Sequence, residues 1–390
     1  MLTSNAPFTR DATGTLCLGG VPIPELHARR RAEDPEARAF YAYDLGLLRE
    51  RASRMREAFA GLQPLIAYAL KANAHESVLR VLREEGLGGE AGSLGELRRA
   101  AAAGFAPERR ILNGNGRTPE EAAWVAEHGV HSVNADSIEE LDLLESTAAA
   151  VGRTIRVSIR VNPGIETPGH RYIATGDHDA KFGVAPAEAL EAWGAAARWP
   201  SLKLDGLHLH LGSQVVDTAP LFAALDIAFE LRAEAGRRGA ELRLFNLGGG
   251  FGIDYERGED VFPLVAYGAA LAERLAGQQL EVAMEPGRWL VGPVGLLVAE
   301  VLWVKRRGGR RFVVLAAGMN DLIRPALYQA RHRIVPVELR AGEHEPACVV
   351  GPVCESADVF GEFEAFGVVE RGDLVAIFDA GAYGAAMASE

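Results

Sequence analysis

A chain of 390 residues is long enough for two domains, and its 48% hydrophobic and 24% charged content is that of a globular protein. The formal net charge of -12, without any long Lys/Arg run, argues against a nucleic-acid or anionic-membrane partner, since both require a positive surface. Three cysteines without metal-type spacing, no apolar signal core and no membrane-length apolar run predict a cytoplasmic protein without a metal site.

Short apolar runs alternate with helix-like segments between about Tyr41 and Glu285, which is typical of a parallel sheet covered by helices. An amphipathic helix over about 45–60 is expected before the first run. The expected strands are 65–70, 87–91, 110–113, 130–134, 155–161, 204–210, 242–247 and 280–284. Eight such strands predict an α/β fold, a (β/α)8 TIM-type barrel.

The predicted helices carry their own start and stop signals. Ser93-Leu-Gly-Glu96 and Thr118-Pro-Glu-Glu121 are typical of capping boxes, with Pro119 at a first helical position. Glycines expected to end helices are Gly86, Gly104 and Gly129.

The pattern changes after Glu285 to β-rich segments without a long helix, which predicts a C-terminal β domain. Its expected strands are 296–304, 312–315, 334–337, 347–350 and 374–378. The first forty residues, with an expected strand near 16–18, do not fit in the barrel. We therefore expect residues 1–40 to join the β domain, 41–285 to form the barrel and 286–390 to form the β domain.

Chemically capable residues directly follow the expected barrel strands. They are Lys71 after the first, Arg160 and Asn162 near the fifth, His210 at the sixth, Gly248–Gly250 after the seventh and Glu285 after the eighth. Each has an ordinary alternative: a solvated loop charge, a core histidine, a flexible turn, or a carboxylate paired with Arg288. Because the carboxyl ends of barrel strands share one mouth, however, we expect these residues to lie together.

Together these residues match the needs of pyridoxal 5'-phosphate (PLP). Lys71 supplies an amine for a Schiff base, and Gly248, Gly249 and Gly250 let backbone amides approach a phosphate, with Ser213 as a further donor. His210 can stack on the ring. Glu285 can keep the pyridine nitrogen protonated, which favours loss of a carboxylate over racemisation.

The same residues lie in ordered motifs that cover the chain from about Tyr41 to its last residues. In the barrel these are Tyr68-Ala-Leu-Lys-Ala-Asn73, Ser93-Leu-Gly-Glu96, Arg160-Val-Asn-Pro163, Lys181-Phe-Gly183, Gly206-Leu-His-Leu-His-Leu-Gly-Ser-Gln214, Asn246-Leu-Gly-Gly-Gly-Phe-Gly252 and Glu285-Pro-Gly-Arg288. In the second domain they are Gly318-Met-Asn-Asp-Leu-Ile-Arg-Pro-Ala-Leu-Tyr328, Gly351-Pro-Val-Cys-Glu-Ser356 and Gly381-Ala-Tyr-Gly384. The motifs resemble those of fold-type III PLP-dependent decarboxylases, most closely the diaminopimelate decarboxylase family.

This resemblance implies decarboxylation of meso-2,6-diaminopimelate to L-lysine, the last step of lysine biosynthesis. It implies that Lys71 is the Schiff-base lysine, that Arg288, Arg324 and Tyr328 bind the far carboxylate of the substrate, and that Cys354 is the proton donor. Glu355 would recognise the distal ammonium, and Tyr383 would reach the cofactor and substrate. Cys354, Glu355 and Tyr383 would belong to the site of a neighbouring subunit, so the resemblance implies a homodimer.

Two alternatives remain at this stage. One is a related decarboxylase of another amino acid or carrier-linked substrate, and the other is a non-catalytic PLP-binding protein. Two residues also depart from the family pattern, because Ala316 replaces an acidic residue and Glu90 stands where Asp is commoner.

Overall fold

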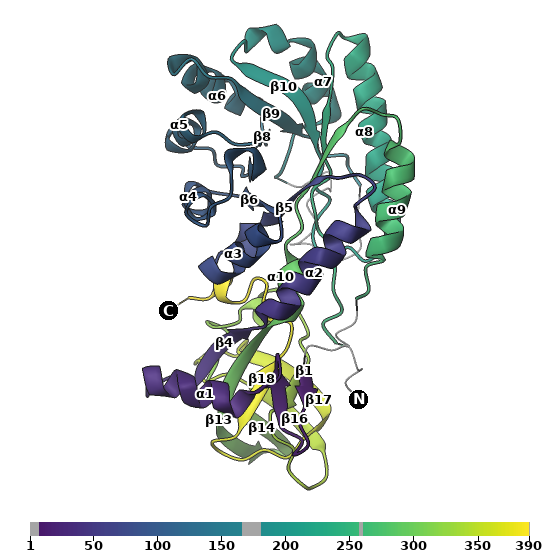
Figure 1. Cartoon of the computed structure of the whole chain (residues 1–390). Coiled ribbons are helices and arrows are strands. Elements are labelled where there is room, and N and C mark those ends of the chain that lie inside the picture. The colour runs from purple at the N-terminus through teal and green to yellow at the C-terminus, as the bar shows by residue number, and fades with distance from the viewer. Residues whose placement is uncertain (1–7, 166–180, 257–259, 390) are drawn as a thin grey trace. The chain divides into compact units, whose positions relative to one another are not determined.

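The structure is a computed structural model that describes residues 8–165, 181–256 and 260–389. The chain forms two compact units. The barrel unit comprises Arg49–Gly252 and Val261–Trp289, and the β unit comprises Met1–Leu48, Ile253–Asp260 and Leu290–Glu390. Figure 1 shows the helices and strands of both units.

In the described part of the barrel unit, eight parallel strands close into a barrel in the order β10-β11-β12-β5-β6-β7-β8-β9. They are β5 (Leu65–Ala69), β6 (Gly88–Ala91), β7 (Arg110–Leu112), β8 (Ser132–Ala135), β9 (Ile155–Arg160), β10 (Leu202–His208), β11 (Leu244–Asn246) and β12 (Glu281–Met284). Each expected strand is present, so the predicted (β/α)8 barrel is confirmed. The observed bounds differ from the expected ones by one or two residues at many strand ends. In particular, β10 ends at His208, so His210 lies in the loop that follows it.

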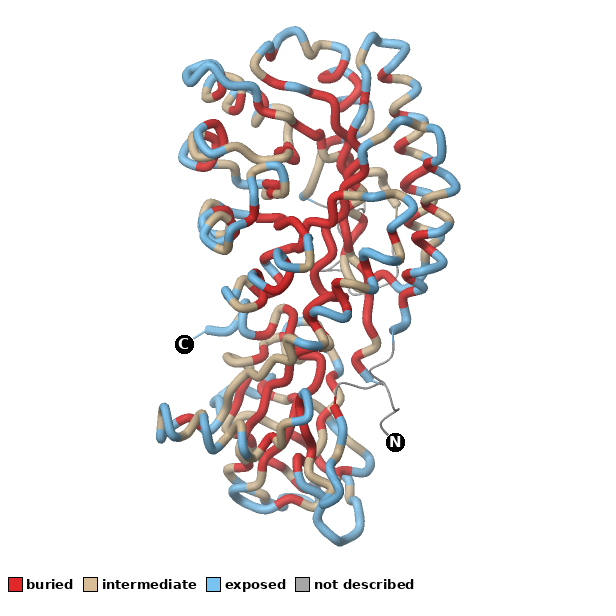
Figure 2. The backbone as a smooth tube through the Cα atoms, viewed as in Figure 1, coloured by how far each residue is buried: buried red, intermediate tan, exposed pale blue. Residues whose placement is uncertain are grey.

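The barrel strands are buried on both faces, which explains their nearly continuous apolar sequences. All five residues of β5 are buried. Across the interior, Leu65 and Ala67 of β5 form one buried cluster with Ile111 of β7, Leu244 of β11 and Ala283 of β12. Figure 2 shows buried backbone along the strands and exposed backbone on the outer faces of the helices.

Helices α3 to α9 follow the strands of the barrel and cover its outside (Figure 1). The helices of this region are α2 (Leu45–Ala58), α3 (Glu76–Glu84), α4 (Leu94–Ala102), α5 (Pro119–His128), α6 (Glu139–Ala150), α7 (Pro186–Gly194), α8 (Ala219–Arg237), α9 (Leu264–Leu275) and α10 (Arg288–Val291). Single 3-10 turns include η1 (Leu70–Ala72), η2 (Pro107–Arg109) and η3 (Ala196–Arg198).

The predicted helix signals are confirmed with one exception. Thr118 and Glu121 form a complete capping box, since each side chain accepts the backbone N–H of the other residue. Ser93 accepts the N–H of Glu96, but the Glu96 carboxylate accepts the N–H of Gly92 instead of Ser93. The capping box predicted there was therefore wrong in its second half, because the Glu96 side chain extends one residue beyond the cap.

The β unit contains a mixed sheet in the order β15-β18-β13-β14-β16-β17, with β4 paired to β13. Its strands are β4 (Ala39–Tyr43), β13 (Gly295–Arg307), β14 (Arg310–Leu315), β15 (Ile334–Pro336), β16 (Glu345–Val350), β17 (Val359–Phe366) and β18 (Leu374–Ile377). Further elements are β1 (Phe8–Arg10), β2 (Leu16–Leu18), β3 (Val21–Pro22), α1 (Ile23–Glu33), η4 (Gly292–Val294), α11 (Arg324–Tyr328) and η5 (Ala385–Met387). The predicted C-terminal β domain is confirmed, whereas α1, β4 and β17 were not predicted.

Strand β13 is the centre of the β unit because both of its faces are buried. Leu297 and Ala299 pack into one hydrophobic cluster, while Leu296 and Val298 pack into another with Phe8 from the N-terminal segment. The described residues of the N-terminal segment thus share a core with the C-terminal sheet.

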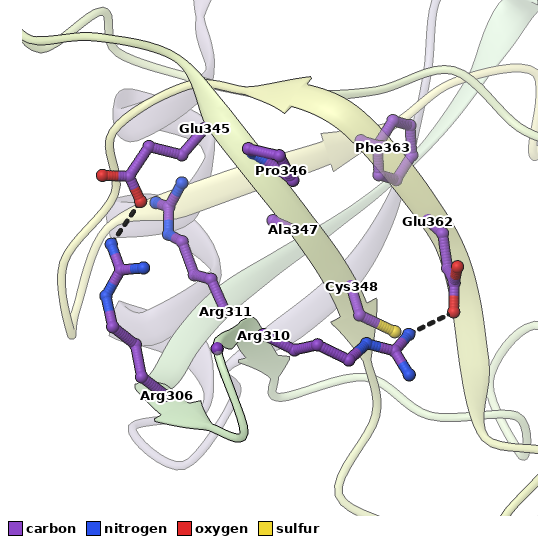
Figure 3. A pocket seen from close by; sticks show the side chains of 10 residues that line it. Arg306, Arg310, Arg311, Glu345, Pro346, Ala347, Cys348, Glu362 and Phe363 are labelled. Atoms are coloured by element: carbon purple, nitrogen blue, oxygen red, sulfur yellow. Dashed lines mark hydrogen bonds and ion pairs between the residues drawn. The ribbon is translucent and has the colours of Figure 1, made fainter.

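A pocket of about 300 Å³ lies on the β unit, between the β13–β14 hairpin and strands β16 and β17 (Figure 3). Arg306 pairs there with Glu345, and Arg310 pairs with Glu362. None of the residues predicted to bind cofactor or substrate lines this pocket. The chemistry predicted from the sequence therefore lies elsewhere.

Candidate active site

Five of the eight barrel strands supply a polar side chain to one region at or near their carboxyl ends. Glu285 directly follows β12, Asn246 ends β11 and His208 ends β10. Asn134 lies in β8 and Asn113 directly follows β7. These five side chains meet at the Glu285 carboxylate.

The Glu285 carboxylate accepts hydrogen bonds on both oxygens. Asn134 Nδ2 and Asn246 Nδ2 donate to Oε1 at 2.8 and 2.6 Å, and Asn113 Nδ2 donates to Oε2 at 2.9 Å. His208 Nε2 lies 3.3 Å from Oε2. The residue is only 6% exposed, so these protein groups replace water as its partners.

This environment keeps Glu285 ionised. Burial alone would raise the pKa of the carboxyl, but attraction to His208 and Lys71 and the hydrogen bonds lower this pKa below its ordinary value. A buried carboxylate that stays charged is suited to hold a proton on a nitrogen base. The described partners of Glu285 are three asparagines and His208, whereas Arg288 donates to Ser213.

The glycine loop after β11 packs directly against the backbone around Glu285. A Cβ atom on Gly249 would lie 2.1 Å from the Glu285 carbonyl oxygen, and one on Gly250 would lie 2.1 Å from the Gly212 carbonyl oxygen. A Cβ on Gly248 would also meet a carbonyl oxygen, at 2.4 Å, and this residue has a φ of 63°. Only glycine fits this loop, and its backbone is therefore left bare.

Asn246 connects the loop to the carboxylate. Its Nδ2 donates to Glu285, while its Oδ1 accepts the N–H of Gly248 at 3.0 Å. The hydrogen bond from the Gly248 N–H to Asn246 Oδ1 thus stabilises the conformation of the loop. Asn246 begins the Asn246-Leu-Gly-Gly-Gly-Phe-Gly252 motif, but its contacts with Glu285 and Gly248 were not predicted from the sequence.

His210 and Lys71 belong to the same group of interacting titratable side chains. Burial lowers the pKa of His210 well below its usual value, and the cations of Arg160 and Lys71 lower it further. The neutral ring accepts the N–H of Gly249 on Nδ1 at 3.3 Å, so its proton is on Nε2. Lys71 lies in the turn η1 after β5, with its side chain 48% exposed.

Ser213 and Arg288 are in direct contact. The guanidinium of Arg288 donates to Ser213 Oγ from Nη2 at 2.9 Å and from Nε at 3.3 Å. A cation thus lies beside a hydroxyl predicted to bind phosphate. Arg288 is 6% exposed, so this positive charge is held in place by its surroundings.

The barrel-unit residues fit PLP. The N–H groups of Gly248 and Gly249 donate to Asn246 and His210, so the loop offers a phosphate mainly the space that its missing side chains leave. The Ser213–Arg288 pair adds a hydroxyl and a cation, and Glu285 offers a fixed negative charge.

The remaining predicted residues lie in the β unit. Arg324 starts α11 and is 5% exposed. Its Nη1 donates to His332 Nε2 at 2.8 Å, and its guanidinium lies 4.3 Å from the centre of the Tyr255 ring. Tyr328 ends the same helix. Arg324 thus has the bracing contacts considered from the sequence, which also fix the orientation of its side chain.

Cys354 and Glu355 lie in an exposed turn between β16 and β17. Buried Asp358 holds this turn, because its carboxylate accepts the N–H groups of Met319 and Val353 at 2.7 and 2.8 Å. Asp358 was missed from the sequence, where its only signal is a charged residue four positions after the cysteine.

Tyr383 has a φ of 57°, a left-handed conformation that is rare for a bulky residue. Such strain is concentrated at functional sites. The structure therefore adds an independent reason to consider Tyr383.

Within 8–165, 181–256 and 260–389, no group of three or more His, Cys, Asp or Glu side chains is arranged to hold a metal ion. Over the same ranges, no helix combines the length and apolar character that crossing a membrane requires.

Comparison with known proteins identifies the family. Residues 45–292 match the family described as "Pyridoxal-dependent decarboxylase, pyridoxal binding domain". A Zymomonas mobilis protein named diaminopimelate decarboxylase is 39% identical over 380 residues, which is 96% of this chain and 89% of that protein.

Two solved structures agree with this match. One is diaminopimelate decarboxylase from Helicobacter pylori complexed with L-lysine, with 37% identity, a TM-score of 0.87 and coverage of 93% of this chain and 90% of that one. The other is diaminopimelate decarboxylase from M. jannaschii with L-lysine, with 31% identity, a TM-score of 0.90 and coverage of 100% and 91%. The chain therefore belongs to the diaminopimelate decarboxylase family of pyridoxal-phosphate-dependent enzymes.

Proposed function

We propose that this enzyme converts meso-2,6-diaminopimelate to L-lysine and carbon dioxide, the last step of lysine biosynthesis. The buried, ionised Glu285 at the barrel mouth is the observation that supports decarboxylation, because a fixed negative charge suits a cofactor that stabilises a carbanion. The substrate is supported by near full-length similarity to proteins named for it and by two related structures that hold L-lysine.

PLP, when bound, supplies the electron sink for loss of the carboxylate. On the proposed assignment, Lys71 Nζ anchors the cofactor aldehyde and Glu285 holds a proton on the pyridine nitrogen. His210 packs its neutral ring against the cofactor. Ser213 and the loop Gly248–Gly250 receive the phosphate, beside the cation of Arg288.

The substrate side is proposed from the family motifs. Arg288, Arg324 and Tyr328 bind the far carboxylate, which two guanidinium groups suit because each can donate two parallel hydrogen bonds. Glu355 binds the distal ammonium. Cys354 protonates the α-carbon after carbon dioxide leaves, and Tyr383 lines the site.

We propose a homodimer whose sites combine residues of both subunits. The exposed position of Cys354 and Glu355, in a turn held by Asp358, supports this proposal because it leaves both side chains accessible to a partner. We also propose a cytoplasmic location, which the three free cysteines support.

The test is a panel of amino acids assayed for carbon dioxide release, with product identification. We expect meso-diaminopimelate to be the preferred substrate and lysine to be the product. Preference for ornithine or for another amino acid would overturn the substrate assignment. Lys71→Ala should abolish both turnover and the covalent attachment of the cofactor, and retention of either would overturn the assignment of Lys71.

A further inference from the structure

Glu90 is a second buried carboxylate beside the proposed cofactor anchor. It lies in β6, where its Cα pairs in register with Ala69 of β5, two residues before Lys71. Its side chain is fully buried, and its Oε2 atom lies 3.4 Å from Lys71 Nζ. The family pattern places the shorter Asp here, so the extra methylene extends the carboxylate of this chain further from the strand.

The two oxygens of Glu90 have different partners. Oε1 accepts a hydrogen bond from Asn113 Nδ2 at 2.9 Å. Oε2 is buried and accepts no hydrogen bond within the described residues, so the Lys71 ammonium is the charge that compensates it. Leaving a buried carboxylate ionised without such a charge is strongly unfavourable, because its desolvation is then uncompensated.

Asn113 joins Glu90 to Glu285. The same Nδ2 atom donates to Glu90 Oε1 and to Glu285 Oε2, both at 2.9 Å. The pKa values of the two carboxyls are shifted in opposite directions. Burial raises the pKa of Glu90, and the attraction of Lys71 opposes this shift. The pKa of Glu285 is lowered. Two carboxyls with pKa values moved apart have different tasks.

The charged groups that act on Glu90 come from four elements. Lys71 after β5 attracts it, Glu285 after β12 and Glu96 of α4 repel it, and Arg160 of β9 interacts with it favourably. Of these, Lys71 is the one in ion-pair contact with Glu90.

We propose that Glu90 is the counter-ion of the Lys71 nitrogen and holds a proton there, acting as a positioning residue for the cofactor anchor. The inference rests on the proposed function, because it takes Lys71 as the anchor. Glu90 is fully buried and its Oε2 atom contacts the Lys71 nitrogen, so its negative charge favours the protonated form of that nitrogen. As the pH rises, the nitrogen releases this proton to solvent, and removal of the Glu90 charge should make the release easier.

The test is a pH titration of the visible absorbance of the holoenzyme, which reports protonation at the Lys71 nitrogen. Glu90→Gln keeps the shape and the acceptor for Asn113 but removes the negative charge. The midpoint should therefore fall by at least about one pKa unit, a tenfold change in the proton equilibrium. Glu90→Asp keeps the charge at a greater distance, so its midpoint should fall by less.

Glu96→Gln is the matched control, because it removes the same charge from the start of α4 and should leave the midpoint at the wild-type value. A Glu90→Gln midpoint equal to or above that of the wild type would overturn the proposal. If Glu90→Gln does not fold, the Glu90→Asp midpoint decides, and an unchanged or raised value overturns the proposal.

Borohydride reduction followed by peptide mass analysis separates this result from failure of the proposed function. Attachment at Lys71 with an unchanged Glu90→Gln midpoint would refute only the role of Glu90. Attachment elsewhere, or colour that survives in Lys71→Ala, would refute the anchor itself.

Discussion

Three asparagine side chains reach the Glu285 carboxylate from β8, β11 and the residue after β7. Each of these amides also has to be oriented, and Asn134 Nδ2 does this by donating to Asn113 Oδ1 at 2.8 Å. The network holds the carboxylate in one position before any cofactor arrives. Electrostatic preorganisation of this kind is a large contribution to catalysis.

Glu285→Gln should therefore lower kcat by about 100-fold or more, because the neutral amide cannot keep a pyridine nitrogen protonated. The cofactor should remain attached, as judged by visible absorbance, since the phosphate and amine contacts are untouched. The matched control is Glu281→Gln, at the other end of β12. A wild-type kcat in Glu285→Gln would contradict the assignment of this carboxylate.

The positions of residues that directly follow barrel strands were the most predictable feature of the candidate site. Lys71 and Glu285 were selected this way, and the structure places them after β5 and β12, because the barrel geometry fixes which end of a strand faces the mouth. Asn113 and Asn134 stand at equivalent positions but were not selected, because an amide has no charge or nucleophile that signals chemistry in a sequence. Their role depends on distances between strands that no local pattern contains.

At the scale of elements, the glycine loop after β11 and the start of the segment after β12 form one packed unit. The N–H of Glu285 donates to the Gly248 carbonyl oxygen at 2.7 Å, and Gly249 leaves no room for a side chain against Glu285. A change in the loop therefore displaces the carboxylate as well.

Gly249→Ala should weaken cofactor affinity at least about tenfold and lower the Tm, because overpacking against a backbone oxygen costs about 1–3 kcal/mol. Cofactor titration and thermal unfolding measure the two effects. Gly95→Ala is the control: it lies on exposed α4, where the nearest atom is Ser93 Oγ at 3.9 Å, and it should retain affinity. Equal affinity in the two variants would contradict the packing argument.

Ion pairs connect strands at the amino-terminal end of the barrel, opposite the end that carries Glu285. Glu281 at the start of β12 contacts His131 Nε2 at 2.6 Å and Arg156 of β9 at 2.5 Å, and Arg156 also contacts Asp205 of β10 at 2.8 Å. The hydrogen bond from His131 and the contacts of Arg156 lower the pKa of Glu281 from 4.5 to about 2, against the effect of burial.

Because this pKa is lowered in the folded state, its stabilising contribution is present above about pH 4.5 and is lost as the pH falls towards about 2. Glu281→Gln should thus show a smaller acid-induced loss of unfolding free energy, measured by urea unfolding across this range. Since the side chain is 46% exposed, the difference at neutral pH should stay below about 1 kcal/mol. Glu127→Gln, at an exposed position of α5, should behave as the wild type, and an identical acid response in both variants would exclude this stabilising role of the Glu281 ion pairs.

The strands of the barrel were predicted better than the elements of the β unit. Apolar runs bounded by turn residues identified all the barrel strands, because burial on both faces leaves little polar sequence in them. Strand β17, Val-Phe-Gly-Glu-Phe-Glu-Ala-Phe, was missed because it alternates with glutamates at one edge of its sheet. Helix α1 was missed because, of its eleven residues, only Ile23 is buried.

At the scale of the whole molecule, the proposed dimer can be tested by complementation. Lys71→Ala and Cys354→Ala should each be nearly inactive alone. If the sites are shared between subunits, mixing them should restore about a quarter of wild-type activity, because half of the dimers are then hybrids with one intact site each. Light scattering should show a dimer throughout.

Two controls frame this experiment. Capture of untagged Lys71→Ala subunits by tagged Cys354→Ala subunits measures subunit exchange, and Lys71→Ala alone fixes the background activity. No recovery after demonstrated exchange would place both residues in the site of a single subunit.

The amino-acid sequence by itself determined the barrel, the β domain, the cofactor and the family, because strand periodicity and ordered motifs are local properties of the chain. Tertiary structure alone decided which side chains share protons and charge. Glu90 and Glu285 are 195 positions apart, yet one asparagine amide bonds to both. The physical reason is that hydrogen bonds and desolvation act over a few ångströms of space, and closure of the barrel sets those distances.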